Sequence, residues 1–237
     1  MKAHYHRQVT RQALADSFSR RALQVILEAS LRQDDLAGQL FHPEYHFDEN
    51  LQDGWSYLDG QHEQARAALD RGDEHSAWQA FGRLIHAAQD FYSHSTYVAV
   101  WASRHSAEER TVHSQDRDLP PGLPPPDSIR PMDPQVLEDP DLRTDHIYFP
   151  WDGISALPLV GLLLRRFMPE DSHTRMNLDS PDSGLLFAYA LQAAAGRTRY
   201  EFERFCDGLE PETLRRFTGC PVEGLSLIHI SEPTRLR

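Results

Sequence analysis

The sequence predicts an all-α fold for this chain of 237 residues. Between Trp78 and Tyr97, apolar residues recur at alternating steps of three and four, which is the spacing of one buried stripe on an α-helix. A second stripe with the same period runs through residues 182–205. No segment alternates apolar and polar residues in the way that predicts a half-buried strand. We therefore expect one helical domain over residues 1–224.

The first half of the chain is expected to form four helices. Apolar residues at helical spacing predict helices over residues 5–18 and 22–29. A polar helix over residues 53–71 is expected to end before Gly72. Asp73 is then a suitable N-cap for the central helix, because its carboxylate can accept a hydrogen bond from a free backbone N–H.

Proline interrupts the middle of the chain. Residues 106–151 include the run PPGLPPPDSIRPMDP, which sustains neither a helix nor a central strand. A loop of this length inside a compact domain is usually a lid, a binding loop or a disordered segment. Beyond this insert, residues 154–167 return to a helical period, and the helix over residues 182–205 follows a second loop.

Charge and composition narrow the range of functions. The formal net charge of −12 argues against a basic surface for nucleic acid, so no specific binding to a nucleic-acid duplex is expected. An anionic substrate is compatible with this charge, since bound divalent metal ions can reverse the local sign. No apolar run reaches transmembrane length, and the first residues lack the apolar core of a signal peptide. The chain as written is expected to be cytoplasmic, or secreted if its true start lies upstream.

Two features near the C-terminus affect the interpretation of the sequence: a pair of cysteines and an adapter-like tail. Cys206 and Cys220 are too few for a disulfide framework. Residues 225–235, LSLIHISEPTR, look like the in-frame translation of a transposase sequencing adapter. We therefore treat residues 225–237 as a non-native tail and exclude them from the predicted fold.

The central helix carries a ridge of three ionisable residues. His86, Asp90 and His94 follow each other at steps of four, so their side chains project along nearly one line. The ridge lies almost opposite the apolar stripe. It is either the solvated face of an amphipathic helix or, if the helix is buried on both sides, a set of metal ligands. The neighbouring Ala87 and Phe91 favour the metal site, because they would be unfavourable in water.

Two loops add residue types that commonly ligate metal ions. Residues 31–50 form either an acidic surface loop or a metal-binding loop whose candidate ligands are Asp34, Asp35, His42, His46 and Asp48. The second loop, near residue 175, holds His173, Asn177 and Asp179. Asp179 has an alternative role as a helix cap, since Pro181 follows it. His6, at the start of the first helix, is by its position alone more typical of a surface residue than of a ligand.

Four motifs along the chain match one family in order. Residues 6–14, HRQVTRQAL, are similar to its opening H-x-x-[IV]-T-x-x-A-L. Gln33-Asp34 and then His46-Phe47-Asp48 resemble its Q-D and H-F-D, and residues 84–95, LIHAAQDFYSHS, resemble its H-x-x-x-D-x-x-S-H core. His173 with NLDSP at 177–181 is similar to its H followed by N-K-D-x-P. From residue 4 to about 205, the chain therefore resembles the zinc-dependent phospholipase C and single-strand nuclease superfamily, most closely the Het-C-like (heterokaryon-incompatibility) branch.

This resemblance implies an all-helical fold around a cluster of two or three Zn²⁺ ions. The ligands it implies for one zinc are Asp34, His46 and His86, and those for another are His94, His173 and Asp179, with Asp90 as the bridge. His6 would serve a further zinc near the N-terminus. The resemblance also implies hydrolysis of a phosphodiester, such as a phospholipid head group, with Asp34 as both ligand and proton acceptor.

The chain departs from the family pattern in three ways. Secreted members bind zinc through the amine and carbonyl of a mature N-terminal tryptophan, which this chain lacks. Their histidine after the bridging aspartate is spaced more widely than His94 is from Asp90. Their final carboxylate would fall at Asn177, so Asp179 takes its place in this chain. The Het-C-like branch shares the last two features.

Three functions are compatible with these patterns. The first is a zinc-dependent phosphodiester hydrolase, in which paired zinc ions activate water. The second is a non-catalytic helical module with a closed structural zinc cluster, stable only with metal bound. The third is a helical interaction protein with incidental histidines. Metal content separates the third function from the other two, and phosphodiester turnover separates the first from the second.

Overall fold

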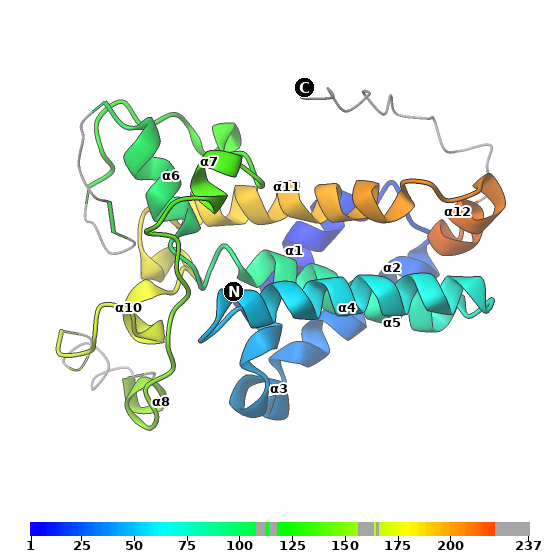
Figure 1. The fold of residues 1–237 in the computed structure, drawn as a ribbon, viewed down its shortest axis with the longest axis horizontal. Helices are drawn as coiled ribbons and strands as arrows, with labels where there is room; N and C mark the ends of the chain where they lie inside the picture. Colours follow the sequence, from blue (N-terminus) through cyan, green and yellow to red (C-terminus); the bar gives the residue numbers. More distant parts are fainter. Residues whose placement is uncertain (108–111, 114–117, 156–163, 165, 221–237) are drawn as a thin grey trace.

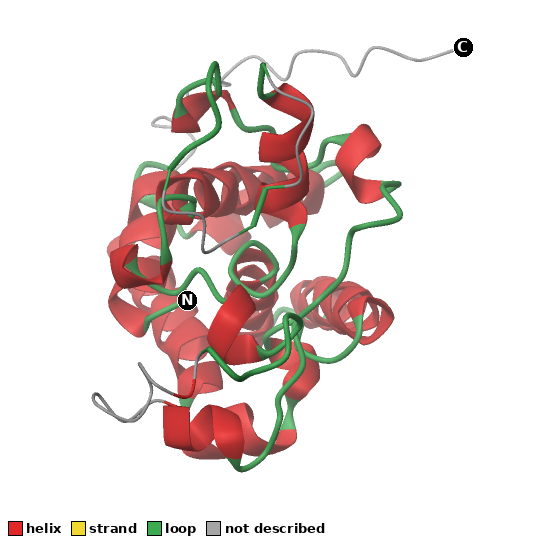
Figure 2. Ribbon diagram, turned by 90° about the vertical axis from the view of Figure 1, so that its left-hand side faces the viewer, coloured by secondary structure: helices red, strands yellow, loops and turns green. Residues whose placement is uncertain are grey.

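A computed structural model describes residues 1–107, 112–113, 118–155, 164 and 166–220. Every regular element in these residues is a helix, and Figure 2 draws none of them as a strand, which confirms the predicted all-α fold. Across the same residues, β-pairing is limited to two isolated bridges, Ser95 with Thr144 and His146 with Ser172. None of the described helices has both the length and the apolar character needed to span a membrane.

Three long helices form the body of the molecule and run along its longest axis: α4 (Leu51–Asp70), α5 (Glu74–Asp90) and α11 (Phe187–Cys206) (Figure 1). Helices α2 (Arg20–Leu31) and α4 pack along α5, and α1 (Ala3–Leu14) packs along α11. In Figure 1, α12 (Pro211–Thr218) lies at one end of the body and the short helices α6, α7, α8 and α10 lie towards the other. The shorter helices, with η for 3₁₀, are η1 (Arg32–Asp34), α3 (Leu36–Phe41), η2 (Pro43–Tyr45), α6 (Tyr97–His105), η3 (Pro126–Ser128), α7 (Pro134–Leu137), α8 (Trp151–Ser155), α10 (His173–Met176) and η4 (Pro181–Ser183).

Helix α5 is the central helix of the fold. It begins where the sequence predicts, because the Asp73 carboxylate accepts a hydrogen bond of 3.0 Å from the backbone N–H of Ser76. Its apolar stripe and the opposite ridge are both buried, and Ala87 and Asp90 on the ridge side are completely inaccessible to solvent. The alternative of a solvated outer face is therefore wrong, and the helix is buried on both sides.

The predicted extension of this helix to Tyr97 is wrong. Helix α5 ends at Asp90, and turns follow, in which backbone groups of Ser93, His94 and Thr96 pair with distant segments. His94 nevertheless stays beside Asp90, since its N–H donates to the Asp90 carbonyl at 2.9 Å. The distant pairs, each at 2.9 Å, are Leu178 N–H to Ser93 O, Asp145 N–H to His94 O, and Thr96 N–H to Arg143 O.

Three other segments differ from the prediction. Residues 31–50 contain η1, α3 and η2 where a loop was expected, and Asp35 caps α3 by accepting a hydrogen bond from Gly38 N–H at 2.8 Å. The helix expected from Asp182 begins at Phe187, because Gly184, with φ of 148°, separates it from η4. The Asp179 cap is also not observed, since η4 has no side-chain cap.

Some expectations fall on parts of the chain that the structure does not describe. Most of the predicted helix 154–167 and the whole adapter-like tail 225–237 lie outside the described residues. Phe167, which was expected on the apolar face of that helix, lies in a turn with its ring exposed. Cys206 and Cys220 are both free thiols.

Candidate metal centre

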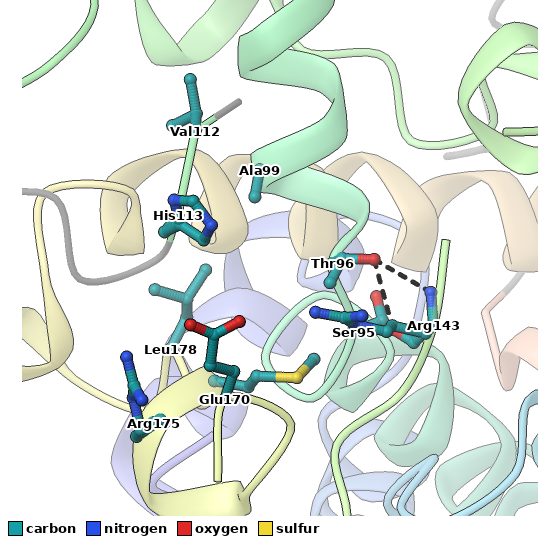
Figure 3. Close-up of a pocket in the computed structure, with 10 residues that line it drawn as sticks. Ser95, Thr96, Ala99, Val112, His113, Arg143, Glu170, Arg175 and Leu178 are labelled. Atoms are coloured by element: carbon teal, nitrogen blue, oxygen red, sulfur yellow. Dashed lines mark hydrogen bonds between the residues drawn. The ribbon is translucent and has the colours of Figure 1, made fainter. Parts of the chain in front are cut away.

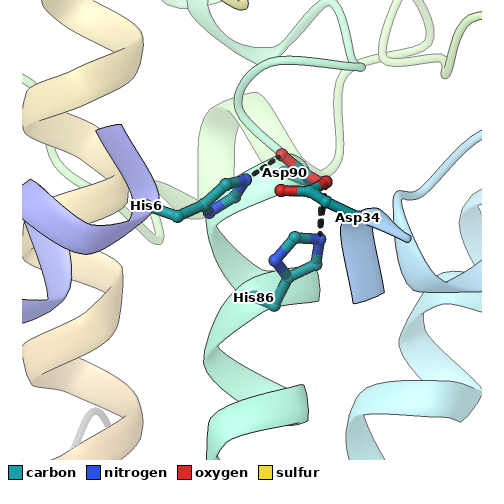
Figure 4. Close-up of side chains that lie close together, drawn as sticks. All are labelled: His6, Asp34, His86 and Asp90. Atoms are coloured by element: carbon teal, nitrogen blue, oxygen red, sulfur yellow. Dashed lines mark ion pairs between the residues drawn. The ribbon is translucent and has the colours of Figure 1, made fainter. Parts of the chain in front are cut away.

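Histidine and aspartate side chains from distant parts of the chain meet at the carboxyl end of α5. Figure 4 shows four of them pointing towards one another: His6 from α1, Asp34 from η1, and His86 and Asp90 from α5. The structure brings together all eight ligands that the resemblance implies, together with Asp48, a candidate from the loop at residues 31–50, and Asp145, which was not predicted. The complete cluster is His6, Asp34, His46, Asp48, His86, Asp90, His94, Asp145, His173 and Asp179.

Asp90 lies at the middle of this cluster with both carboxylate oxygens facing imidazole rings. Oδ1 is 3.1 Å from Nε2 of His6, and Oδ2 is 2.8 Å from Nδ1 of His46 and 3.1 Å from Nε2 of His86. The Met1 amine also lies 2.5 Å from Oδ1. Asp90 therefore connects donor groups that approach it from two sides.

The first group of donor atoms has the dimensions of a zinc site. Nε2 of His86 lies 3.3 Å from Nδ1 of His46 and 3.6 Å from Oδ1 of Asp34, and Asp90 Oδ2 completes the group. Tetrahedral zinc with bonds of about 2.0–2.1 Å would place its ligand atoms about 3.3–3.4 Å apart. The observed separations bracket this value.

The second group surrounds His94 and His173, whose rings stack with centroids 4.8 Å apart. On one side, Nε2 of His94 is 3.3 Å from Asp179 Oδ1 and Nε2 of His173 is 3.8 Å from Asp179 Oδ2. On the other side, both Nδ1 atoms face Asp145 Oδ2, and Asp48 Oδ1 lies 3.0 Å from Nδ1 of His94. Both imidazoles thus lie between carboxylates.

His6 is completely buried, so the interpretation that favoured a surface position for it is wrong. Its Nδ1 lies 2.7 Å from Oε1 of Gln89. The Gln89 amide nitrogen donates to the hydroxyls of Thr10 and Thr198, and the Thr198 hydroxyl already donates to a carbonyl of its own helix. The Gln89 oxygen must therefore accept from Nδ1–H of His6, which leaves Nε2 as the ring atom that faces Asp90.

Unsatisfied polar atoms are concentrated in this cluster. Two other buried side-chain N or O atoms in the described part of the chain lack a hydrogen-bond partner, on Ser30 and His62. Buried polar groups are normally paired, so unpaired atoms that gather at one place indicate a missing ion or water. Imidazole and carboxylate donors without thiolates suit Zn²⁺, and the residues present fit that ion. The atoms of the cluster without a hydrogen-bond partner are His6 Nε2, Asp34 Oδ2, His46 Nε2, Asp48 Oδ1, His86 Nδ1, Asp145 Oδ1 and Asp179 Oδ1, the last of which forms an ion pair of 2.8 Å with the Met1 amine.

A tight turn brings His46 and Asp48 into the cluster. Between them, Phe47 has a left-handed backbone with φ of 60°, an unfavourable conformation for an aromatic residue. Its buried ring holds it there by packing against Trp55 and Phe91 at centroid distances of 5.0 and 5.1 Å. Strained residues of this kind persist where the surrounding packing fixes them, often at functional sites.

We expect Gly54→Ala to destabilise this turn. A Cβ at Gly54 would overlap the Phe47 ring, and overpacking of this kind typically costs about 1–3 kcal/mol in the free energy of unfolding. Zinc affinity should fall as well, because Phe47 lies between two members of the cluster. Gly60→Ala on the same helix is the matched control, since nothing lies within 4 Å of its added Cβ. Equal stability of the two variants in urea denaturation would contradict the prediction.

The cluster shifts the protonation of its members in opposite directions. Burial alone would raise the pKa of Asp90, but the Met1 amine, His6 and His86 hold it well below its usual range. Burial would lower the pKa of His173, but Asp145 raises it to about 9. For His94, Asp48 and Asp179 likewise outweigh burial and raise the pKa well above its usual value.

These pKa shifts predict that zinc binding releases protons. His94 and His173 carry protons at neutral pH without metal, and zinc binds only the neutral imidazole. The apparent zinc affinity should therefore rise with pH up to about 9, by as much as about tenfold per pH unit for each proton displaced. Titration calorimetry at pH 7 in buffers of different ionisation enthalpy measures this release. Binding heats independent of the buffer would count against the predicted protonation.

Three side chains of the cluster are partly exposed to solvent. The side chains of Asp34, Asp179 and His173 are 17%, 22% and 29% exposed, whereas those of His6, His86 and Asp90 are completely buried. A separate pocket contains Thr96, Arg143, Glu170 and Arg175 (Figure 3), and no side chain of the cluster lines it. Asp48 lines a different hollow, which also holds Glu44, Glu49 and Asp53.

Residues 2–114 match the family described as the VWA7 N-terminal domain. The match begins before α1 and continues past α6. It contains seven members of the cluster, whereas Asp145, His173 and Asp179 lie beyond it. No curated protein and no solved structure matches the chain.

Several candidate residues lie outside the cluster. His42 contacts Glu44 at 3.0 Å with both side chains partly exposed, and the Asn177 amide donates to the His173 carbonyl at 2.7 Å. Asp145 was not predicted, because it lies in the irregular insert where no periodicity assigns a direction to side chains. The only sequence signal for it is a carboxylate beside His146 near the end of the insert.

Proposed function

We propose that this chain is a zinc-dependent phosphodiester hydrolase of phospholipase C type. The observation that carries the proposal is the buried cluster of imidazoles and carboxylates around Asp90, in which seven polar atoms have no hydrogen-bond partner. The resemblance of the four ordered motifs to zinc-dependent phospholipases C supports the same activity. The match to the VWA7 N-terminal domain does not bear on the reaction.

The two donor groups would hold two zinc ions that share Asp90. One set of ligands would be Asp34, His46, His86 and Asp90, and the other His94, His173 and Asp179 together with Asp90. His6 would serve a third ion on the Oδ1 side of Asp90. When bound, such paired ions bind phosphate oxygens and lower the pKa of a bound water, which supplies the nucleophile near neutral pH.

Asp34 is the residue that we propose as the proton acceptor. Burial, followed by the charge of Asp90, raises the pKa of Asp34 above its usual value, which makes it a stronger base than an ordinary aspartate. Its Oδ2 is buried without a hydrogen-bond partner, whereas the side chain as a whole is 17% exposed. Oδ1, 3.6 Å from His86 Nε2, would remain with the metal while Oδ2 takes the proton.

A structural zinc cluster without turnover is the alternative. It would require a closed set of ligands with no open coordination position. The partial exposure of Asp34, His173 and Asp179 favours catalysis over this alternative, because side chains of both groups are accessible to solvent. The net charge of −12 repels anions from the protein surface in general. Bound zinc would reverse the charge locally, and a phosphate group would therefore bind at the zinc ions.

Chelation and reloading test the proposal. Zinc-loaded protein is expected to hydrolyse bis(p-nitrophenyl) phosphate or p-nitrophenylphosphorylcholine, to lose this activity with 1,10-phenanthroline, and to regain it with added Zn²⁺. If elemental analysis finds fewer than one bound metal per chain, both zinc-dependent functions are excluded and a helical interaction protein is the remaining function. If the protein binds two zinc ions but hydrolyses none of several phosphodiesters, the hydrolase is excluded and the structural zinc module is the remaining function.

A further inference from the structure

A short segment of the proline-rich insert, residues 143–146, lies between the loops that carry His94 and His173. Its backbone bonds to both loops: Asp145 N–H donates to the His94 carbonyl, and His173 N–H donates to the His146 carbonyl, each at 2.9 Å. On a third side, the Asp145 carbonyl accepts from Glu49 N–H at 2.8 Å. The segment therefore holds three loops of the cluster in fixed positions around Asp145.

The Asp145 side chain contacts both histidines through one oxygen. Its Oδ2 lies 3.2 Å from Nδ1 of His94 and 3.0 Å from Nδ1 of His173, and both contacts have hydrogen-bond geometry. Asp145 is completely buried, yet these two imidazoles outweigh burial and hold the pKa of its carboxyl below the usual range. Asp145 is therefore a buried carboxylate placed behind two rings.

We propose that Asp145 is a positioning residue that orients His94 and His173 for a shared metal ion. By accepting from Nδ1–H of both rings, it would leave both Nε2 atoms unprotonated on the side of Asp179, which lies 3.3 and 3.8 Å away. This inference rests on the proposed metal centre. A carboxylate behind a metal-binding imidazole fixes the tautomer and the ring orientation, and its loss typically weakens metal affinity by about 10- to 100-fold.

A different role for Asp145 is direct metal binding. One donor atom each from Asp48, His94, Asp145 and His173 lie within 4.8 Å of one another, which could fit an ion on the Nδ1 side. The hydrogen-bond geometry favours orientation instead, because Oδ2 lies at hydrogen-bond distance from both Nδ1 atoms, and an Nδ1–H on each ring would leave no nitrogen lone pair on that side.

Zinc titration against a chromogenic chelator separates these roles. Asp145→Asn is expected to bind as many zinc ions as the unmodified protein, with one of them held about 10- to 100-fold more weakly. Asp152→Asn is the matched control, since Asp152 is a buried carboxylate in α8, directly after the insert, that accepts from Tyr148 and Thr174 backbone N–H groups instead. It should keep wild-type zinc affinity.

Three results would overturn the proposal. Unchanged affinity in Asp145→Asn would remove the positioning role, and the loss of a whole ion at saturating zinc would make Asp145 a ligand. Equal weakening by Asp145→Asn and Asp152→Asn would indicate a general effect on this part of the chain. If the unmodified protein binds no zinc, the proposed function itself fails, and this outcome is visible before any variant is made.

Nuclear magnetic resonance of the zinc-loaded, ¹⁵N-histidine-labelled protein gives a second readout that does not depend on a variant folding. His94 and His173 are expected as Nδ1–H tautomers with slowly exchanging ring protons. Those two protons should shift or disappear in Asp145→Asn and persist in Asp152→Asn. An Nε2–H tautomer at either histidine in the unmodified protein would overturn the proposal.

Discussion

Asp90→Asn is expected to release zinc from the purified protein and to lower phosphodiester turnover by roughly a thousandfold or more. Asparagine keeps the volume of the side chain but removes the charge that faces His6, His46 and His86. Its amide nitrogen would also direct N–H groups at the position of a cation. Stabilisation of transition-state charge by metal ions contributes several kcal/mol, and about 4 kcal/mol corresponds to a thousandfold in rate.

Metal content by elemental analysis and kcat/KM for a chromogenic phosphodiester measure this effect. Asp73→Asn is the matched control, because Asp73 lies at the other end of α5 and asparagine caps a helix about as well as aspartate. Circular dichroism of both variants shows whether the helices remain. If Asp90→Asn retains zinc and turnover, Asp90 is not the bridge and the proposed mechanism is wrong.

Helical periodicity predicted the parts of the fold that amphipathic packing determines. Residues 53–71 and the apolar stripe of α5 have the expected positions because each buries one face against a neighbouring helix. The end of α5 was not predictable in this way, since Phe91 and Tyr92 continue the apolar pattern beyond Asp90. Beyond Asp90, backbone groups of later residues pair with the insert and with Leu178.

The candidate site was predictable only where a motif or a helix assigned positions to side chains. His86 and Asp90 followed from helix geometry, and His46 and His173 followed from the family resemblance. Asp145 had neither signal. Its position depends on backbone hydrogen bonds between residues far apart in the sequence, and an irregular insert gives no pattern from which such pairing can be deduced.

A second buried charge cluster offers a contrast to the metal centre. Arg197 and Glu201, one turn apart on α11, are both buried and bonded, with Arg197 Nε 2.6 Å and Nη2 2.5 Å from Glu201 Oε1. The guanidinium also lies over the Trp55 ring at 5.1 Å. Here the opposite charges satisfy each other directly, whereas the groups around Asp90 retain unpaired atoms that a cation would satisfy.

Glu201→Gln is therefore expected to lower the free energy of unfolding by about 3–5 kcal/mol, because it leaves the Arg197 guanidinium buried without its counter-charge. Glu212→Gln is the matched control, since Glu212 pairs with Arg215 on the exposed surface of α12, where an ion pair contributes at most about 1 kcal/mol. Urea denaturation of both variants measures the difference.

The double variant Arg197→Met with Glu201→Leu separates two possible causes of the instability of Glu201→Gln. One is the loss of attraction between the two side chains, and the other is the cost of burying a guanidinium without a counter-charge. If the cost arises from the uncompensated guanidinium, removing both charges should recover most of the lost stability, since apolar groups of similar volume often replace a buried ion pair without loss. A double variant as unstable as Glu201→Gln would instead mean that the pair itself stabilises α11. If the groups around Asp90 hold zinc, as we propose, the same comparison made there should differ, and stability should rise with added zinc.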